Sequence, residues 1–69
     1  MDIEEIKAAV RRKPFRPFSV NVVDGEQLHI SQESEVLFPR SKPQLVIVFN
    51  PDGTMHLLEA EAVSSLITQ

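Results

Sequence analysis

The chain has 69 residues, of which 42% are hydrophobic, so it can bury one small core and forms a single domain at 1–69. It has no cysteine, which excludes disulfide bonds and thiolate metal sites, and its net charge of −3 disfavours general binding to polyanions. The longest apolar run, LVIVF at 45–49, is far too short to cross a membrane. We therefore expect a cytoplasmic domain with no membrane association, no metal and no cofactor.

The first predicted element is a helix at about 3–12. Asp2 suits the N-cap position, and Glu5 lies three residues further on, as in a capping box. Apolar residues recur at helical spacing and give the helix one apolar side: Ile3, Ile6 and Val10. Pro14 then ends the helix because proline has no backbone donor. A helix this short is unstable alone, so its apolar side must pack against another element.

A change to a period of two marks the first hairpin. From Phe18 onward, apolar residues alternate with polar ones in FSVNV, which is typical of a half-buried strand. A two-residue turn in the following VDGE would place apolar residues opposite polar ones. A three-residue loop instead pairs Val20 with Leu28 and Phe18 with Ile30, and it requires Gly25 in the left-handed region. We predict the three-residue loop.

The second hairpin begins with LVIVF, whose continuous apolar character predicts a strand buried on both faces. The turn NPDG follows, with Gly53 at the left-handed position. The same loop type pairs Ile47 with Leu57 and Val48 with His56. Apolar residues then oppose one another across the hairpin, which supports this register.

The last segment, EAEAVSSLITQ, allows two structures. Its alanines favour one helix over 59–67, whereas valine, isoleucine and threonine favour a turn at 59–62 followed by a strand. We expect the turn and the strand. The predicted strands are then at about 18–23, 26–31, 36–38, 44–49, 54–58 and 64–68.

The order of these segments resembles that of the Sm-like and SH3-like small β-barrels. The resemblance rests on the helix DIEEIKAAVRR, the pair FSVNVVDG and EQLHI, the hairpin LVIVFNPDGTMHLL and the ending EAVSSLIT. It implies an α+β fold in which the N-terminal helix packs on a strongly twisted five-stranded antiparallel sheet. The chain is also similar to a group of very small bacterial proteins with a Pro-Phe-x-Pro-Phe segment, here Pro14 to Phe18. That similarity implies a fold but no activity.

The same resemblance carries over no RNA-contacting residue. Sm proteins read RNA with an Asp-x-x-Asn-like stretch in the loop that follows their second and third strands. The corresponding region here, SQESEVLFPRS, has no asparagine. Small barrels also serve many unrelated functions, so the architecture does not choose one.

The stretch RRKPFRPF combines basic and aromatic residues and has two interpretations. Its cations could bind phosphates of RNA or DNA while its phenylalanines stack on bases: Arg11, Arg12, Lys13 and Arg16. Alternatively, the cations complement the negative end of the helix dipole while Phe15 and Phe18 are buried. We favour the second interpretation, because both phenylalanines adjoin prolines and Phe18 is in strand phase. Nucleic-acid binding is possible but not favoured.

Catalytic patterns are not apparent in the sequence. Ser64 and Ser65 have no identifiable base near them, and both glycines are needed for turns, which leaves no phosphate-binding loop. His29 and His56 fall in different strands without the spacing of metal ligands. We do not expect an enzyme.

The apolar residues exceed what one helix and one small sheet can cover, and small sheets leave open strand edges. We therefore expect a homo-oligomer, first a symmetric dimer and second an Sm-like ring. The residues expected at the associating edges are Met55, Leu57, Leu66 and Ile67. The sequence thus predicts a non-enzymatic, self-associating interaction or assembly module. The alternative is an Sm-like RNA- or DNA-binding protein that uses the basic helix end.

Overall fold

The computed structural model describes residues 1–68 and forms an α+β fold from one helix and six strands. The elements are α1 (Ile3–Arg11), β1 (Phe18–Val22), β2 (Gln27–Ile30), β3 (Val36–Leu37), β4 (Leu45–Phe49), β5 (Met55–Glu59) and β6 (Val63–Thr68), with the 3₁₀ turns η1 (Glu33–Glu35) and η2 (Ala60–Ala62). Every predicted helix or strand is present, and each boundary differs from the prediction by at most one residue. The predicted α+β class is confirmed.

The prediction of one five-stranded, barrel-like sheet is wrong. Within residues 1–68, the six strands form two antiparallel sheets of three, in the orders β2-β1-β6 and β3-β4-β5, and they do not close into a barrel. The polar segment between β2 and β3 turns the chain, because the Glu35 carboxylate accepts hydrogen bonds from the backbone N–H groups of Ser31 (2.7 Å) and Gln32 (3.1 Å). This turn separates β2 from the two-residue β3, so the strands belong to different sheets.

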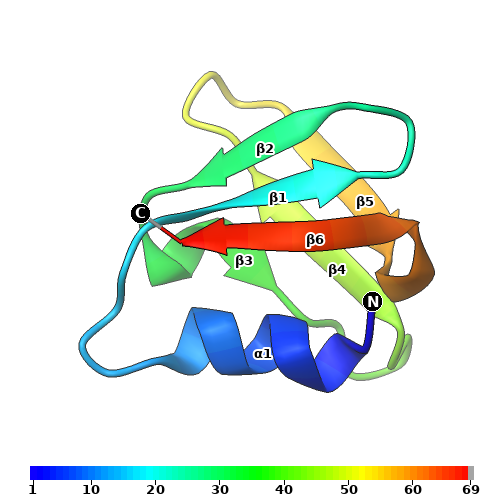
Figure 1. Cartoon of the computed structure of the whole chain (residues 1–69), viewed down its shortest axis with the longest axis horizontal. Helices are drawn as coiled ribbons and strands as arrows, with labels where there is room; N and C mark the ends of the chain where they lie inside the picture. The colour runs from blue at the N-terminus through cyan, green and yellow to red at the C-terminus, as the bar shows by residue number, and fades with distance from the viewer. Residues whose placement is uncertain (69) are drawn as a thin grey trace.

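The two sheets cross face to face, and α1 lies across one end of the space between them (Figure 1). The turn η2 links the sheets at a second point. The Ala60 N–H donates to the carbonyl of Gln44 (2.8 Å), while the Ala62 carbonyl accepts from the N–H of Val23 (2.9 Å). Residues 60–68 are therefore a turn followed by a strand, as predicted, and the alternative of one helix over 59–67 is wrong.

The start of α1 confirms the predicted N-cap. Asp2 Oδ1 accepts a hydrogen bond from the Glu4 N–H (3.1 Å), which satisfies one of the free donors of the first turn. Within residues 1–68, the reciprocal bond of a capping box from Glu5 is not formed. The apolar side of the helix is buried as predicted, at Ile3, Ile6 and Val10.

Both hairpins have the predicted registers. Val20 pairs with Leu28 and Phe18 with Ile30, while Ile47 pairs with Leu57. The two turn glycines adopt left-handed conformations, with φ of +98° at Gly25 and +92° at Gly53. Matching apolar residues across each pair and a glycine in each turn therefore determined both registers.

The core lies between the sheets and the helix. Its buried apolar side chains are Ile3, Ile6, Val10, Phe18, Val20, Val22, Leu28, Ile30, Val46, Val48, Ala60 and Val63. The prediction that LVIVF is buried on both faces is wrong, because Val46 and Val48 are buried while Phe49 is 39% exposed. Strand β4 has a neighbouring layer on one face only, so its alternate side chains remain at the surface.

Candidate functional site

The outer face of the sheet β3-β4-β5 is apolar and exposed. In the antiparallel register, Leu37 on β3 is opposite Ile47 on β4, and Ile47 is opposite Leu57 on β5. A second pair, Phe49 and Met55, continues the same face toward the β4–β5 turn. Leu37, Met55 and Leu57 are each at least half exposed, at 50%, 52% and 57%. We call the residues on this surface the apolar face: Leu37, Leu45, Ile47, Phe49, Met55 and Leu57.

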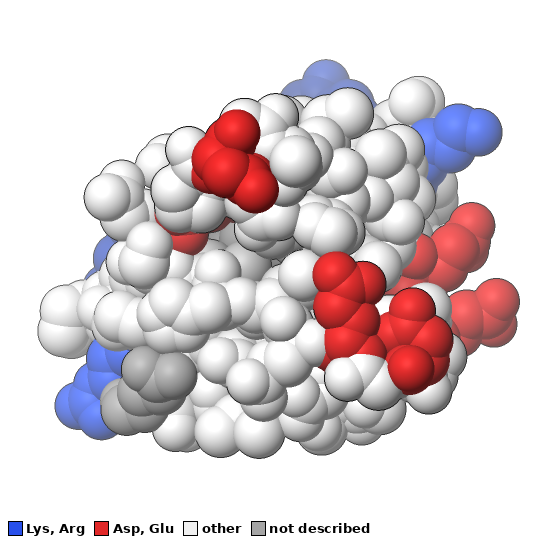
Figure 2. Space-filling model, turned by 90° about the horizontal axis from the view of Figure 1, so that it is seen from above, with Lys and Arg blue, Asp and Glu red and all other residues white. Residues whose placement is uncertain are grey.

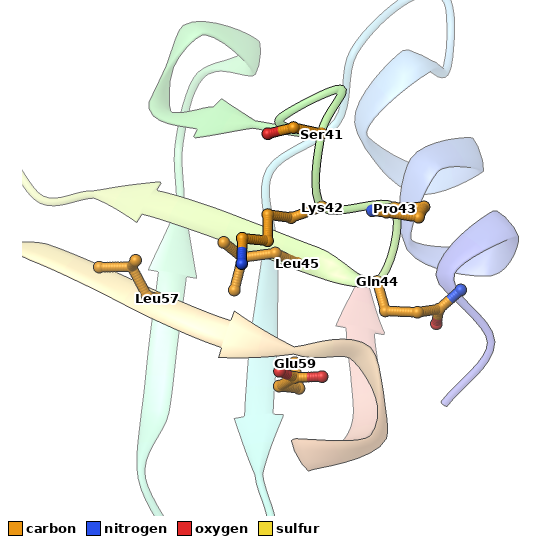
Figure 3. A pocket seen from close by; sticks show the side chains of 7 residues that line it. All are labelled: Ser41, Lys42, Pro43, Gln44, Leu45, Leu57 and Glu59. Carbon is orange, nitrogen blue, oxygen red and sulfur yellow. The ribbon is translucent and has the colours of Figure 1, made fainter.

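One end of the apolar face is bordered by charges of opposite sign. Lys42, from the loop before β4, and Glu59, at the end of β5, line an open hollow of about 430 Å³ together with Leu45 and Leu57 (Figure 3). Leu45 is paired with Glu59 across the two strands. The border of the face therefore carries one basic and one acidic side chain.

The outer face of the other sheet is polar and internally hydrogen-bonded. Gln27 Nε2 donates to Asn21 Oδ1 (2.9 Å), and Asn21 Nδ2 donates to Ser65 Oγ (2.9 Å). These hydrogen bonds link β2, β1 and β6, and they pair the polar side chains with one another without a partner molecule. Ile67, which is 47% exposed on β6, is a large apolar residue on this sheet. The two sheets therefore differ sharply in the chemistry of their exteriors.

The residues predicted at associating edges divide between the two sheets. Met55 and Leu57 belong to the apolar face on β5, which is an edge strand of its sheet. Ile67 is exposed on β6, an edge strand of the other sheet, whereas Leu66 is half-buried and packs against the core.

Sequence reasoning missed the other four residues of the apolar face: Leu37, Leu45, Ile47 and Phe49. For the three residues of β4, the error came from treating the whole run LVIVF as buried. Alternate residues of any strand point to opposite faces. This spacing would have separated the inward-facing from the outward-facing residues of β4 once one face was known to be exposed.

The predicted basic cluster at the end of α1 does not converge on one site. Lys13 Nζ is 2.8 Å from Glu33 Oε1, so this charge is paired. The Arg11 guanidinium instead lies over the Phe38 ring, 5.8 Å from its centroid. Arg12, which lies between Arg11 and Lys13 in the chain, and Arg16 are both exposed.

The phenylalanines beside this cluster belong mainly to the core. Phe18 is 1% exposed, and Phe15 is half-buried with its ring centroid 6.1 Å from that of Phe18. The interpretation of Phe18 as a core anchor is therefore confirmed, and this ring cannot stack on a base.

Charged side chains are unevenly distributed over the surface. The face opposite α1 carries several acidic side chains, and its basic side chains stand only at the margins (Figure 2). The segment 18–38 contains four acidic residues and no lysine or arginine. This face should repel a polyanion, so a negatively charged ligand would approach the molecule from another side.

Two carboxylates have pKa values below their ordinary range. At Glu35, partial desolvation raises the pKa, but hydrogen bonds from Ser31 and Gln32 outweigh it and lower the pKa overall. At Asp52, hydrogen bonds from the hydroxyl and the N–H of Thr54 lower the pKa. Both carboxylates accept bonds from their own loops, which indicates that they hold turns in place.

The histidines occupy the positions that the registers predict. His29 is opposite Ser19, and its Nδ1 is 3.4 Å from Ser19 Oγ. His56 is opposite Val48, with its Nδ1 3.8 Å from Glu26 Oε1. Within residues 1–68, no three histidine, aspartate or glutamate side chains are grouped to hold a metal ion. In that same range, no helix has the length and apolar character needed to cross a bilayer.

No protein-family model, curated protein or solved structure shows a significant match to this chain.

Proposed function

We propose that the protein is a non-enzymatic interaction module that associates with a second copy of itself through the apolar face. The observation that carries the proposal is the row of Leu37, Ile47 and Leu57, which runs unbroken across all three strands of one sheet. Large contiguous apolar patches on the surface of a soluble protein are typical of interaction sites. The outer face of the other sheet is polar, so an apolar exterior is not a general property of the sheets in this molecule.

The energetic balance favours association that depends on protein concentration. Full burial of a large aliphatic side chain contributes about 1.5–3 kcal/mol, and the side chains of the apolar face are about half buried already. A dimer would gain roughly 10 kcal/mol from the two faces together. The loss of translational and rotational freedom costs about 4–15 kcal/mol. Because these contributions are similar in size, we expect a reversible dimer.

The charges at the border favour a second copy as the partner. Lys42 and Glu59 line the same hollow on one chain. A two-fold axis that lies in the plane of the face, runs parallel to β4 and passes between these two side chains would bring Lys42 of one copy toward Glu59 of the other. Symmetric dimers of this kind are the commonest oligomers of soluble proteins. Hence we propose a face-to-face dimer.

The test compares the solution mass of two charge variants with that of the unchanged chain. Light scattering after size exclusion, over about 1–300 μM protein, should show monomer converting to dimer. Leu57→Lys places a charge within the face, beside Ile47, and should leave only monomer. Val23→Lys is the matched control, because Val23 is 66% exposed in the β1–β2 turn outside the face. An unchanged chain that stays monomeric throughout, or an equal effect of both substitutions, would refute the proposal.

An Sm-like ring remains the second arrangement that we propose to test. Such a ring would join the open edges of β5 and β6, and Ile67 is exposed on β6. Ile67→Lys distinguishes the two arrangements. It should leave the mass of a face-to-face dimer unchanged, whereas it should break a ring into smaller species.

A further inference from the structure

A second hollow lies between α1 and the loop that follows β3. Its volume is about 360 Å³, and it is lined by Lys7, Arg11, Phe38, Pro39, Arg40 and Pro43. Two lining residues come from the helix and four come from a segment about thirty residues further along the chain. The fold therefore assembles this hollow from distant segments, and no local sequence motif predicts it.

Three positive charges line this hollow around one aromatic ring. Lys7 Nζ and the Arg11 guanidinium carbon are each 5.8 Å from the centroid of the Phe38 ring, which is within range of a cation–π contact. Arg40 is an exposed lining residue on the loop. The ring thus holds two cations at the wall of the hollow.

These charges are only partly compensated. Lys7 Nζ is 3.6 Å from Glu4 Oε2, an exposed pair of a kind that contributes little stability. Among residues 1–68, neither Arg11 nor Arg40 forms a salt bridge. Three like charges that share a small hollow repel one another, and a bound anion would relieve that repulsion.

We propose that this hollow binds a terminal phosphate group carried by a small organic molecule, that is, a phosphate monoester. A phosphate monoester carries about −1.5 to −2 charges and three strong acceptor oxygens, which suits several converging cations better than a carboxylate does. Arginine presents a planar fork of donors that matches phosphate geometry. Arg11 and Arg40 can supply two such forks from opposite sides of the hollow.

The remaining walls indicate an organic substituent on the phosphate. Phe38, Pro39 and Pro43 give the hollow an apolar wall that inorganic phosphate alone would leave uncovered. Its volume falls at the lower end of the range for small-molecule pockets, about 300–1,000 Å³. This size suits a mononucleotide or a smaller ester rather than a long polymer.

The binding test uses three probes that separate phosphate recognition from ring stacking. Adenosine 5′-monophosphate, inorganic phosphate and adenosine are titrated into ¹⁵N-labelled protein at low salt, and backbone shifts of residues 7–11 and 38–43 are followed. The proposal predicts the tightest binding for the monophosphate, weaker binding for phosphate and none for adenosine. No shift with either phosphate-containing probe at about 10 mM, well above a typical millimolar dissociation constant, would overturn it.

Charge-neutral variants test whether the hollow itself is the site. Arg40→Gln and Arg11→Gln should each weaken monophosphate binding about tenfold, the usual effect of losing one charged hydrogen bond. Arg12→Gln removes the same charge from the residue beside Arg11, which does not line the hollow, and should change the dissociation constant less than about twofold. An equal loss in all three variants would mean that only general charge attracts the anion, which would overturn the proposal.

A variant that binds the monophosphate more tightly provides a control, because misfolding could explain a loss of affinity but not a gain. Glu4→Gln removes the acidic partner of Lys7, so monophosphate binding should tighten by about two- to fivefold. Weaker binding in this variant would contradict the assigned role of Lys7.

The source of the phosphate is distinguished with two short oligonucleotides of the same sequence, one with and one without a 5′-phosphate. Stronger binding of the phosphorylated form supports recognition of a terminal phosphate on a nucleic acid. Binding of the free monophosphate alone assigns the site to small metabolites. Equal binding of both oligonucleotides through Arg12 and Arg16 would instead support the nucleic-acid alternative and overturn the hollow as the phosphate site.

Discussion

Ile47 on β4 and Leu57 on β5 are directly opposite each other, and both point away from the core of their own molecule. The chain neighbours of Ile47, Val46 and Val48, point inward and are buried. One strand therefore contributes alternate side chains to the folding core and to the proposed dimer. Substitutions of the inward-facing side chains should lower the free energy of unfolding, whereas substitutions of the outward-facing side chains should weaken dimerisation.

The first prediction concerns these two faces of the second hairpin. Val48→Ala should lower the free energy of unfolding by about 2 kcal/mol, because it removes buried methyl groups and leaves a cavity. Leu57→Ala should change the free energy of unfolding of the monomer by less than about 1 kcal/mol. Urea unfolding measures both values, at a protein concentration low enough to keep the chain monomeric. Equal destabilisation by the two substitutions would contradict the exposed position of Leu57.

The second prediction concerns the turn glycines. Gly25 and Gly53 have φ of +98° and +92°, and an added Cβ at either position would meet no atom within 4 Å. Alanine there would be strained by backbone conformation alone, which costs about 1–2 kcal/mol per site. Urea unfolding of each single variant and of the double variant measures the cost. Because the turns belong to different sheets, we expect the two losses to add, and a loss below about 0.3 kcal/mol would contradict the left-handed turn.

The third prediction concerns acid stability. The pKa of Glu35 lies below its ordinary value of 4.5 in the folded protein, and that of Asp52 lies below 3.8. A lowered folded-state pKa stabilises the protein above the unfolded pKa, and this contribution is lost as the pH falls through the folded pKa. The urea concentration at the unfolding midpoint should therefore decrease as the pH is lowered from about 5 to about 3.

The control for acid stability is Glu35→Gln combined with Asp52→Asn. Both replacements keep an acceptor oxygen for the loop N–H groups but cannot titrate. The urea midpoint of this variant should depend less on pH in the acid range than that of the unchanged chain. A steeper acid dependence in the variant would contradict the assignment of these two carboxylates.

The fourth prediction concerns the ion pair between Lys13 and Glu33. Its atoms are 2.8 Å apart, but the side chains are 74% and 42% exposed, so water and salt weaken it. Lys13→Ala should lower the free energy of unfolding by less than about 1 kcal/mol at low salt. The difference should disappear near 1 M salt, where screening is nearly complete. Urea unfolding at the two salt concentrations measures it, and a large loss that persists in high salt would indicate a packing role for the lysine stem.

Local structure was predictable from sequence because short-range chemistry controls it. Asp2 and Pro14 delimit the helix, and Gly25 and Gly53 allow the two tight turns. Apolar residues that match across each hairpin select the register, since a slip of one residue would turn every side chain to the wrong face. These preferences need no knowledge of the rest of the fold.

The arrangement of layers was decided only by tertiary structure. No property of LVIVF shows how many of its faces another layer covers, so the outward-facing side chains of β4 were mistaken for core. The separation of six strands into two sheets depends on the turn held by Glu35, whose bonds form within an otherwise polar loop.

The two candidate surfaces follow the same division. The apolar face and the hollow of Lys7, Arg11 and Arg40 join residues that are distant in the chain. The sequence by itself determined which segments become helix, strand or turn, because backbone preferences and alternation act over a few residues. The tertiary structure decided which side chains stay exposed and which charges meet, because burial and proximity depend on every layer packed together.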